Sequence, residues 1–170
     1  MIFRLSQKLN TKIKAGTLAI LPLDENPFAD WSAHLFIADR TQYILLSNTK
    51  SLYSTVMYGK GITNDSAFIE RALSNIREFM EDDGQEFVYQ RLIAPASASV
   101  RFAKALNRSV TGSMNDMTKH AAYHLAEDDV APFEIGTRLN TIPMSALKHD
   151  GSTHGFPRDA FEEMVSSLES

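Results

Sequence analysis

The chain has 170 residues, a mass of 19.0 kDa and a formal net charge of −4. Hydrophobic residues make up 44% and charged residues 22%, a composition typical of a soluble globular protein and unlike that of disordered, collagenous or membrane chains. Cysteine is absent, which excludes disulfides, thiolate nucleophiles, iron–sulfur clusters and cysteine-ligated zinc.

A chain of this length is expected to form one domain, residues 1–170, with a substantial core. Lysine and arginine interrupt the apolar positions between Met1 and Lys14, and no run approaches the roughly 20 apolar residues of a spanning helix. We therefore expect a cytoplasmic bacterial protein with no membrane partner. The pI near 5.7 disfavours nucleic-acid binding through bulk charge.

The first half of the chain predicts β-strands. Short strands are expected at 3–5 and at 18–21, the second ended by Pro22. Apolar runs at 33–39 and 42–47 predict a hairpin around Asp39-Arg40, although this pair is not the usual choice for a primed turn. A further strand is expected over 52–58, ended by Gly59-Lys60-Gly61.

The second half predicts helices. An apolar stripe over 68–80 indicates a helix that begins at 64–66 and ends near Gly84, followed by a shorter helix over 85–92. Ser97 or Ser99 is expected to cap a helix that carries the apolar residues of 100–106, and Ser113 the next, over 114–125. We expect a loop with at most one strand over 130–144, because Pro132 and Pro143 break the pattern. A polar connector over 148–157 then leads to a final helix over 161–168.

Strands followed by helices predict an α+β fold. In this fold a mostly antiparallel sheet from the N-terminal half is covered, on one face, by helices from the C-terminal half.

The polar run at 107–116 is the densest group of hydrogen-bonding side chains. It follows three cations spaced i, i+3 and i+7, which would share one face of the expected helix. Such a face binds phosphate, RNA or an acidic protein surface, unless it is an ordinary solvated helix face. The candidate ligand or partner residues here are Arg101, Lys104, Arg108, Ser109, Ser113, Asn115 and Asp116.

Trp31 and His34 complete the candidate set. Trp31 is expected to close the edge of the core, and the alternative is that it lines a pocket or partner surface together with His34. We expect the run 108–116 to lie at the edge of the largest concave site, near these two residues. If all its polar groups are instead satisfied internally, the run is a structural brace.

No catalytic residue, cofactor or metal is predicted. His120 and His124 have a metal-binding spacing of i and i+4, but we interpret them as residues at the border of a packed face. His149 and His154 are expected to be solvated loop residues. Gly59-Lys60-Gly61 does not match a phosphate loop, since its lysine is not followed by Ser or Thr.

Several segments resemble an uncharacterised bacterial family of unknown function. They are 3–9, 26–31, the hairpin at Asp39-Arg40, 108–116 and 155–158, and the most specific of them contains Gly112-Ser113-Met114-Asn115-Asp116. The resemblance implies a domain found alone or beside a plasmid-type ORF-three-like module. It assigns no activity and no catalytic residues.

These patterns favour a protein that acts by binding another protein, without catalysis, since no set of catalytic groups is adjacent in sequence. One alternative is nucleic-acid or nucleotide-phosphate binding through the basic face. The other is a metal-assisted hydrolase built on His120 and His124.

Overall fold

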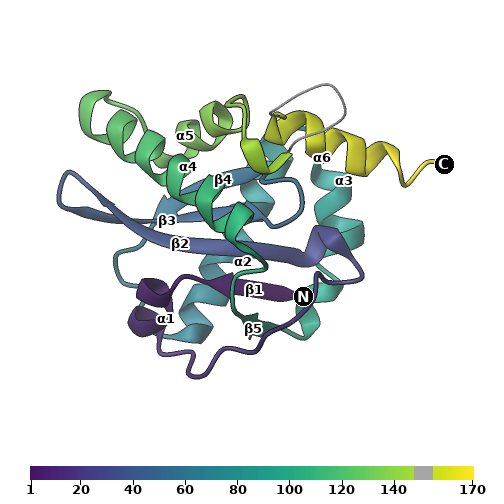
Figure 1. Cartoon of the computed structure of the whole chain (residues 1–170), viewed down its shortest axis with the longest axis horizontal. Helices are drawn as coiled ribbons and strands as arrows, with labels where there is room; N and C mark the ends of the chain where they lie inside the picture. Colours follow the sequence, from purple (N-terminus) through teal and green to yellow (C-terminus); the bar gives the residue numbers. More distant parts are fainter. Residues whose placement is uncertain (148–154) are drawn as a thin grey trace.

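The computed structural model describes residues 1–147 and 155–170. Its central sheet has the strand order β4-β3-β2-β1-β5 (Figure 1). The strands are β1 (Ile2–Leu5), β2 (Asp30–Ala38), β3 (Thr41–Asn48), β4 (Ser54–Tyr58) and β5 (Arg101–Ala103). The pairs β2–β3 and β3–β4 are antiparallel, whereas β1 pairs in parallel with both β2 and β5. The predicted α+β fold with a mostly antiparallel sheet is confirmed, and among the described strands only the short β5 comes from the second half of the chain.

The helices lie on both faces of the sheet, so the prediction of one covered face is wrong. The helices are α1 (Gln7–Ile13), α2 (Asp65–Asp82), α3 (Glu86–Val88), α4 (Arg108–Glu127), α5 (Pro132–Leu139) and α6 (Pro157–Ser166). Figure 1 shows α4 crossing one face and α2 lying behind the other. The run Tyr43 to Leu46 gives the reason, because its successive residues are all apolar and supply both faces.

Two groups of buried side chains fill the space on either side of the sheet. The α2 face buries Phe3, Trp31, Ile44, Tyr53 and Phe68. The α4 face buries Leu45, Val56, Met114, Met117 and Ile135. Alternate residues of one strand therefore belong to different cores, as the pleat requires.

The predicted hairpin is confirmed and turns at Asp39-Arg40. Asp39 has φ 46° and Arg40 has φ 64°, so both residues adopt the left-handed conformation of a primed turn. The predicted strand that ends at Gly59 and the helix that follows it are also confirmed. The Asn64 side chain accepts from the backbone N–H of Ala67 at the start of α2, and Gly84 adopts φ 77° beyond its end.

Two predictions for the N-terminal segment are wrong. Helix α1 was not expected, yet Ser6 caps it and Leu9 and Ile13 are buried at helical spacing. The strand expected at 18–21 is absent, since Ala19 makes only an isolated bridge to Ala103.

The largest corrections lie after residue 95. The expected helix over 100–106 is a strand, β5, and α4 begins at Arg108 with Asn107 rather than Ser113 as its N-cap. The expected loop over 130–144 contains α5, because Pro132 occupies the first turn of the helix, where its missing N–H costs nothing. The short helix after Gln85 and the final helix α6 are present as predicted.

Candidate functional site

A groove of about 740 Å³ opens between β2, the start of α1 and the N-terminal half of α4. Its apolar lining includes Phe36, Ile37, Val110 and Met114. Its polar lining includes Ser6, Lys8, His34, Thr111 and Asn115. A mixed lining of this kind is typical of a recognition surface, in which apolar contacts supply area and polar groups fix orientation.

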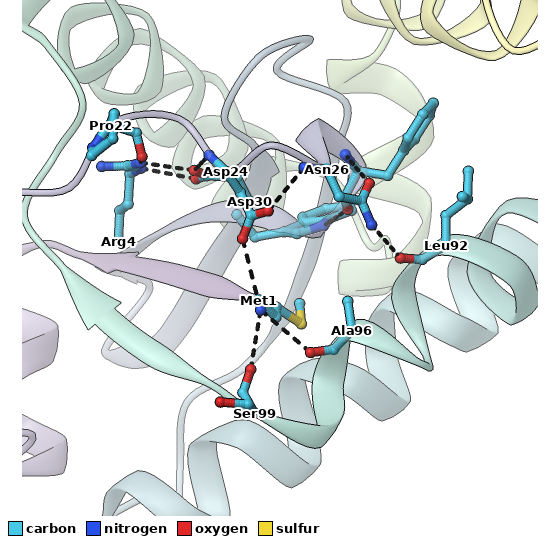
Figure 2. Close-up of polar contacts among 11 residues, drawn as sticks. Met1, Arg4, Pro22, Asp24, Asn26, Asp30, Leu92, Ala96 and Ser99 are labelled. Atoms are coloured by element: carbon cyan, nitrogen blue, oxygen red, sulfur yellow. Dashed lines mark hydrogen bonds and ion pairs between the residues drawn. The ribbon is translucent and has the colours of Figure 1, made fainter.

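Arg4, one of the residues that line the groove, forms a buried ion pair with Asp30 (Figure 2). Arg4 Nε and Nη2 donate to the Asp30 carboxylate at 2.8 and 2.7 Å. The same guanidinium donates to the backbone carbonyls of Leu21, Pro22 and Lys104 at 2.9, 2.9 and 3.1 Å. These bonds use all five N–H donors of the guanidinium, so Arg4 fixes the loops beside the groove and is not free to bind an anion.

His34 lies on the α4 face of β2 and points toward Asn115. Burial lowers the pKa of the His34 imidazole, and interaction with the Asn115 side chain opposes this shift only in part. His34 is therefore neutral near pH 7, with one ring nitrogen donating and the other accepting. Such a group can donate and accept hydrogen bonds in the groove without adding charge.

The polar run at 107–116 forms the start of α4 rather than a linker. The Asn107 side chain accepts from the N–H of Val110 at 2.9 Å, and its backbone carbonyl accepts from the Thr111 hydroxyl at 3.2 Å. Thr111 and Asn115 face the groove, whereas Ser113 is buried and its hydroxyl has no hydrogen-bond partner among the described residues. The run thus combines a capping function with one wall of a concave site.

The predicted basic face does not exist as a helical surface. Arg101 belongs to β5, Lys104 follows that strand, and Arg108 begins α4. All three side chains are exposed, and none lines the groove. Because i and i+3 point to opposite faces of a strand, the geometric argument for nucleic-acid or phosphate binding is lost.

Ser109 and Asp116 are exposed and do not line the groove. Asp116 instead borders a smaller hollow of about 200 Å³ together with His120.

Trp31 closes the core, as expected, and does not line the groove. Its side chain is fully buried, and its indole N–H donates to the carbonyl of Phe28 at 2.8 Å. Trp31 and His34 are three positions apart on one strand, so their side chains lie on opposite faces of the sheet.

The expectation that the polar run borders the largest hollow is wrong. A larger hollow of about 940 Å³ lies between α6 and the loop that contains Pro27. Its walls include Leu147 and Gly155, which flank residues 148–154, outside the described part of the chain. Because this hollow adjoins residues outside the described part of the chain, we base no site on it.

His124, one of the two histidines at the metal-binding spacing, contacts a carboxylate. His124 Nδ1 lies 2.9 Å from an Asp128 carboxylate oxygen that also accepts from Arg138 at 2.9 Å. Hydrogen bonds from His124 and Arg138 lower the pKa of the Asp128 carboxyl. Across residues 1–147 and 155–170, no group of three metal-ligating side chains converges. His149 and His154 lie outside the described residues.

Sequence reasoning did not identify Ser6, Lys8 or Phe36 as site residues. A signal existed for the first two, since Ser6 precedes apolar positions Leu9 and Ile13 at helical spacing, which predicts a capped helix start. No sequence pattern marks Phe36 as a site residue. Phe36 lines the groove because α4 crosses β2 in the folded structure.

The chain belongs to the family described as domain of unknown function DUF6933, which it matches over residues 2–160. No curated protein matches the chain. Among the helices in 1–147 and 155–170, none has the length and apolarity needed to cross a membrane.

Proposed function

We propose that this protein acts by binding a partner protein, without catalysis, and that the partner occupies the groove between β2 and α4. The proposal includes residence in a bacterial cytoplasm, where a cysteine-free chain loses no stabilising disulfide. The supporting observation is a preformed groove whose lining combines apolar and polar side chains.

The composition of the groove carries the argument. Phe36 and Ile37 present apolar surface from β2, and the buried side chains of Val110 and Met114 lie behind the α4 wall. His34 and Asn115 provide hydrogen-bonding groups between these apolar patches. Protein interfaces combine apolar anchors with such polar groups, and anchors at the centre supply most of the affinity.

The test places a bulky side chain in the groove. Asn115 is exposed on α4 and lines the groove, so Asn115→Trp is expected to obstruct it while leaving the core intact. Ala126→Trp is the matched control, because Ala126 is exposed near the other end of the same helix and lies outside the groove.

Wild-type protein and both variants are used as baits in the native host, and the affinity of each captured partner is then measured with purified components. We expect a partner that binds wild type and Ala126→Trp equally and Asn115→Trp at least about ten-fold more weakly, a difference of about 1.4 kcal/mol. A partner that binds all three baits with equal affinity contradicts the assignment of this groove.

A further inference from the structure

Strand β2 has an open backbone edge inside the groove. The neighbouring strand β1 pairs only with Asp30 to Ala33, although β2 continues to Ala38. After Leu5 the chain leaves the sheet and enters α1. The second half of β2 therefore has β3 on one side and no strand on the other.

The direction of the backbone groups follows from bonds on both sides of β2. Ala33 accepts from the N–H of Ser6 at 3.0 Å, which shows that odd-numbered residues of β2 face β1. Gln42, the partner of Ile37 in β3, accepts from the N–H of Gly59 and so faces away from β2. The Leu35 carbonyl and both backbone groups of Ile37 must then point toward the open side.

These groups have no partner in the described part of the chain. The Leu35 N–H makes a long bond of 3.4 Å to the Ser6 hydroxyl, but no hydrogen bond reaches the Leu35 carbonyl or the Ile37 backbone from that side. Leu35, Phe36 and Ile37 all line the groove. The open edge and the groove are thus the same surface.

Natural sheet edges are normally protected by charge, proline, a bulge or a covering segment. The opposite edge of this sheet shows such protection, since the Asn140 side chain bonds both backbone groups of Ser54 at 2.7 and 3.0 Å. The open part of β2 has continuous register and carries an Ile37 side chain that is 63% exposed. It has the features of a strand that accepts another strand.

The charge beside this edge is positive. Helix α1 carries Lys8 and Lys12 one turn apart and contains no acidic residue. Lys8 makes no ion pair in the described part of the chain, and Lys12 contacts the neutral side chain of Gln42 at 2.5 Å. No aspartate or glutamate lines the groove, although the whole chain has a net charge of −4.

We propose that the occupant of the groove is an acidic, extended segment of a partner protein that adds to the sheet as a strand beside β2. This inference rests on the proposed function and specifies its partner. The added strand donates to the carbonyls of Leu35 and Ile37 and accepts from the Ile37 N–H. Its alternate side chains lie toward the α4 side, where Phe36 supplies apolar surface, and toward α1, where carboxylates complement Lys8 and Lys12.

The first test uses a labelled, end-blocked peptide in which aspartate alternates with valine, measured by fluorescence anisotropy. We expect saturable binding to wild-type protein. The same peptide with N-methyl groups on alternate amides keeps its charge and side chains but loses edge donors, so its affinity is expected to fall at least about ten-fold. Equal affinity of the two peptides overturns strand addition.

The second test changes the protein. Ile37→Pro removes the N–H that faces the open side together with the isoleucine side chain, whereas Ile37→Ala removes the side chain and keeps that N–H. We expect Ile37→Pro to lose the peptide and Ile37→Ala to retain the larger part of the binding, with circular dichroism confirming that both are folded. The Lys8→Glu and Lys12→Glu pair is expected to abolish binding of the acidic peptide.

The outcomes separate this inference from the proposed function. If Asn115→Trp loses a protein partner that Ile37→Pro still binds, the groove is correct and strand addition is wrong. If a single-stranded oligonucleotide competes with the peptide at equal or lower concentration, the assignment to an acidic peptide is wrong. Loss of the peptide with Ile37→Pro and with both lysine reversals supports the inference.

Discussion

Replacement of Asp30 by Asn is expected to destabilise the protein strongly without changing the size of the side chain. The Asp30 carboxylate accepts from Arg4 Nε at 2.8 Å, from Arg4 Nη2 at 2.7 Å and from the Asp24 N–H at 3.0 Å. Asp30→Asn removes the counter-charge of a guanidinium that is 1% exposed. Breaking one partner of a buried pair costs about 3–5 kcal/mol.

The backbone carbonyls of Leu21, Pro22 and Lys104 still accept from Arg4 in this variant. We therefore expect a loss near the lower limit, about 3 kcal/mol, out of the roughly 5–15 kcal/mol typical of a domain. With a urea m-value of about 2 kcal/mol per molar, the unfolding midpoint should fall by about 1.5 M at constant m.

The matched control is Glu81→Gln. Glu81 lies 3.8 Å from Arg77, and the two side chains are 43% and 52% exposed, so loss of this pair is expected to cost at most about 0.5 kcal/mol. If urea unfolding gives the two variants the same midpoint, the buried pair is not a major contributor to stability and the argument is refuted.

The remaining predictions concern packing, an edge contact and pH. Gly112→Ala should stabilise the protein by about 1 kcal/mol, because Gly112 is exposed on a helix and an added Cβ would meet no atom within 4 Å. Gly136→Ala should destabilise it by about 1–3 kcal/mol, because the added Cβ would lie 2.8 Å from the Phe79 ring. If thermal unfolding ranks the two variants in the opposite order, this account is contradicted. Asn140→Ala should cost about 2–4 kcal/mol in chemical denaturation, since it leaves both backbone groups of Ser54 buried and unpaired. Burial lowers the pKa of His34 below its unfolded value near 6.5, so its contribution to stability is complete above that pH and is lost as the pH falls toward the folded pKa. His34→Gln should flatten this part of the stability profile, and an NMR titration in which the His34 ring has an ordinary pKa would contradict the assignment.

Where local signals agreed with the tertiary structure, the sequence predicted the fold. The stripe over 68–80 predicted α2, and the two apolar runs around Asp39-Arg40 predicted the β2–β3 hairpin. Both depend on neighbours in sequence, and tertiary packing preserves them. The continuous apolar run in β3 correctly indicated a strand. It also indicated that both faces of this strand are buried, and this second implication was not recognised.

The failures occur where tertiary contacts decide. The segment Arg101 to Ala103 has apolar neighbours at helical spacing, yet it is a strand because parallel pairing with β1 satisfies its backbone groups. The N-cap of α4 was also misjudged, because Asn and Ser cap helices about equally well and residue type does not distinguish Asn107 from Ser113 in the same polar run. The wrongly predicted helix over 100–106 created the basic helical face, and with it the phosphate-binding alternative.

The candidate site was predictable only in part. The sequence singled out His34 and Asn115, which the structure brings together in the groove. It did not indicate the open backbone edge, because the edge arises from the difference in length between β1 and β2 rather than from any side chain. Backbone groups without a partner have no signature in amino-acid type.

The contact between Asn140 and Ser54 joins residues 86 positions apart. The β2–β3–β4 meander involves only near neighbours in sequence and is therefore able to form early during synthesis, whereas its outer edge stays bare until α5 has been made and has docked. If translation pauses before α5 is made, the nascent chain contains the folded β2–β3–β4 meander with the outer edge of β4 unpaired. We therefore expect such nascent chains to self-associate through this edge during expression, whereas the same edge is covered in the mature protein.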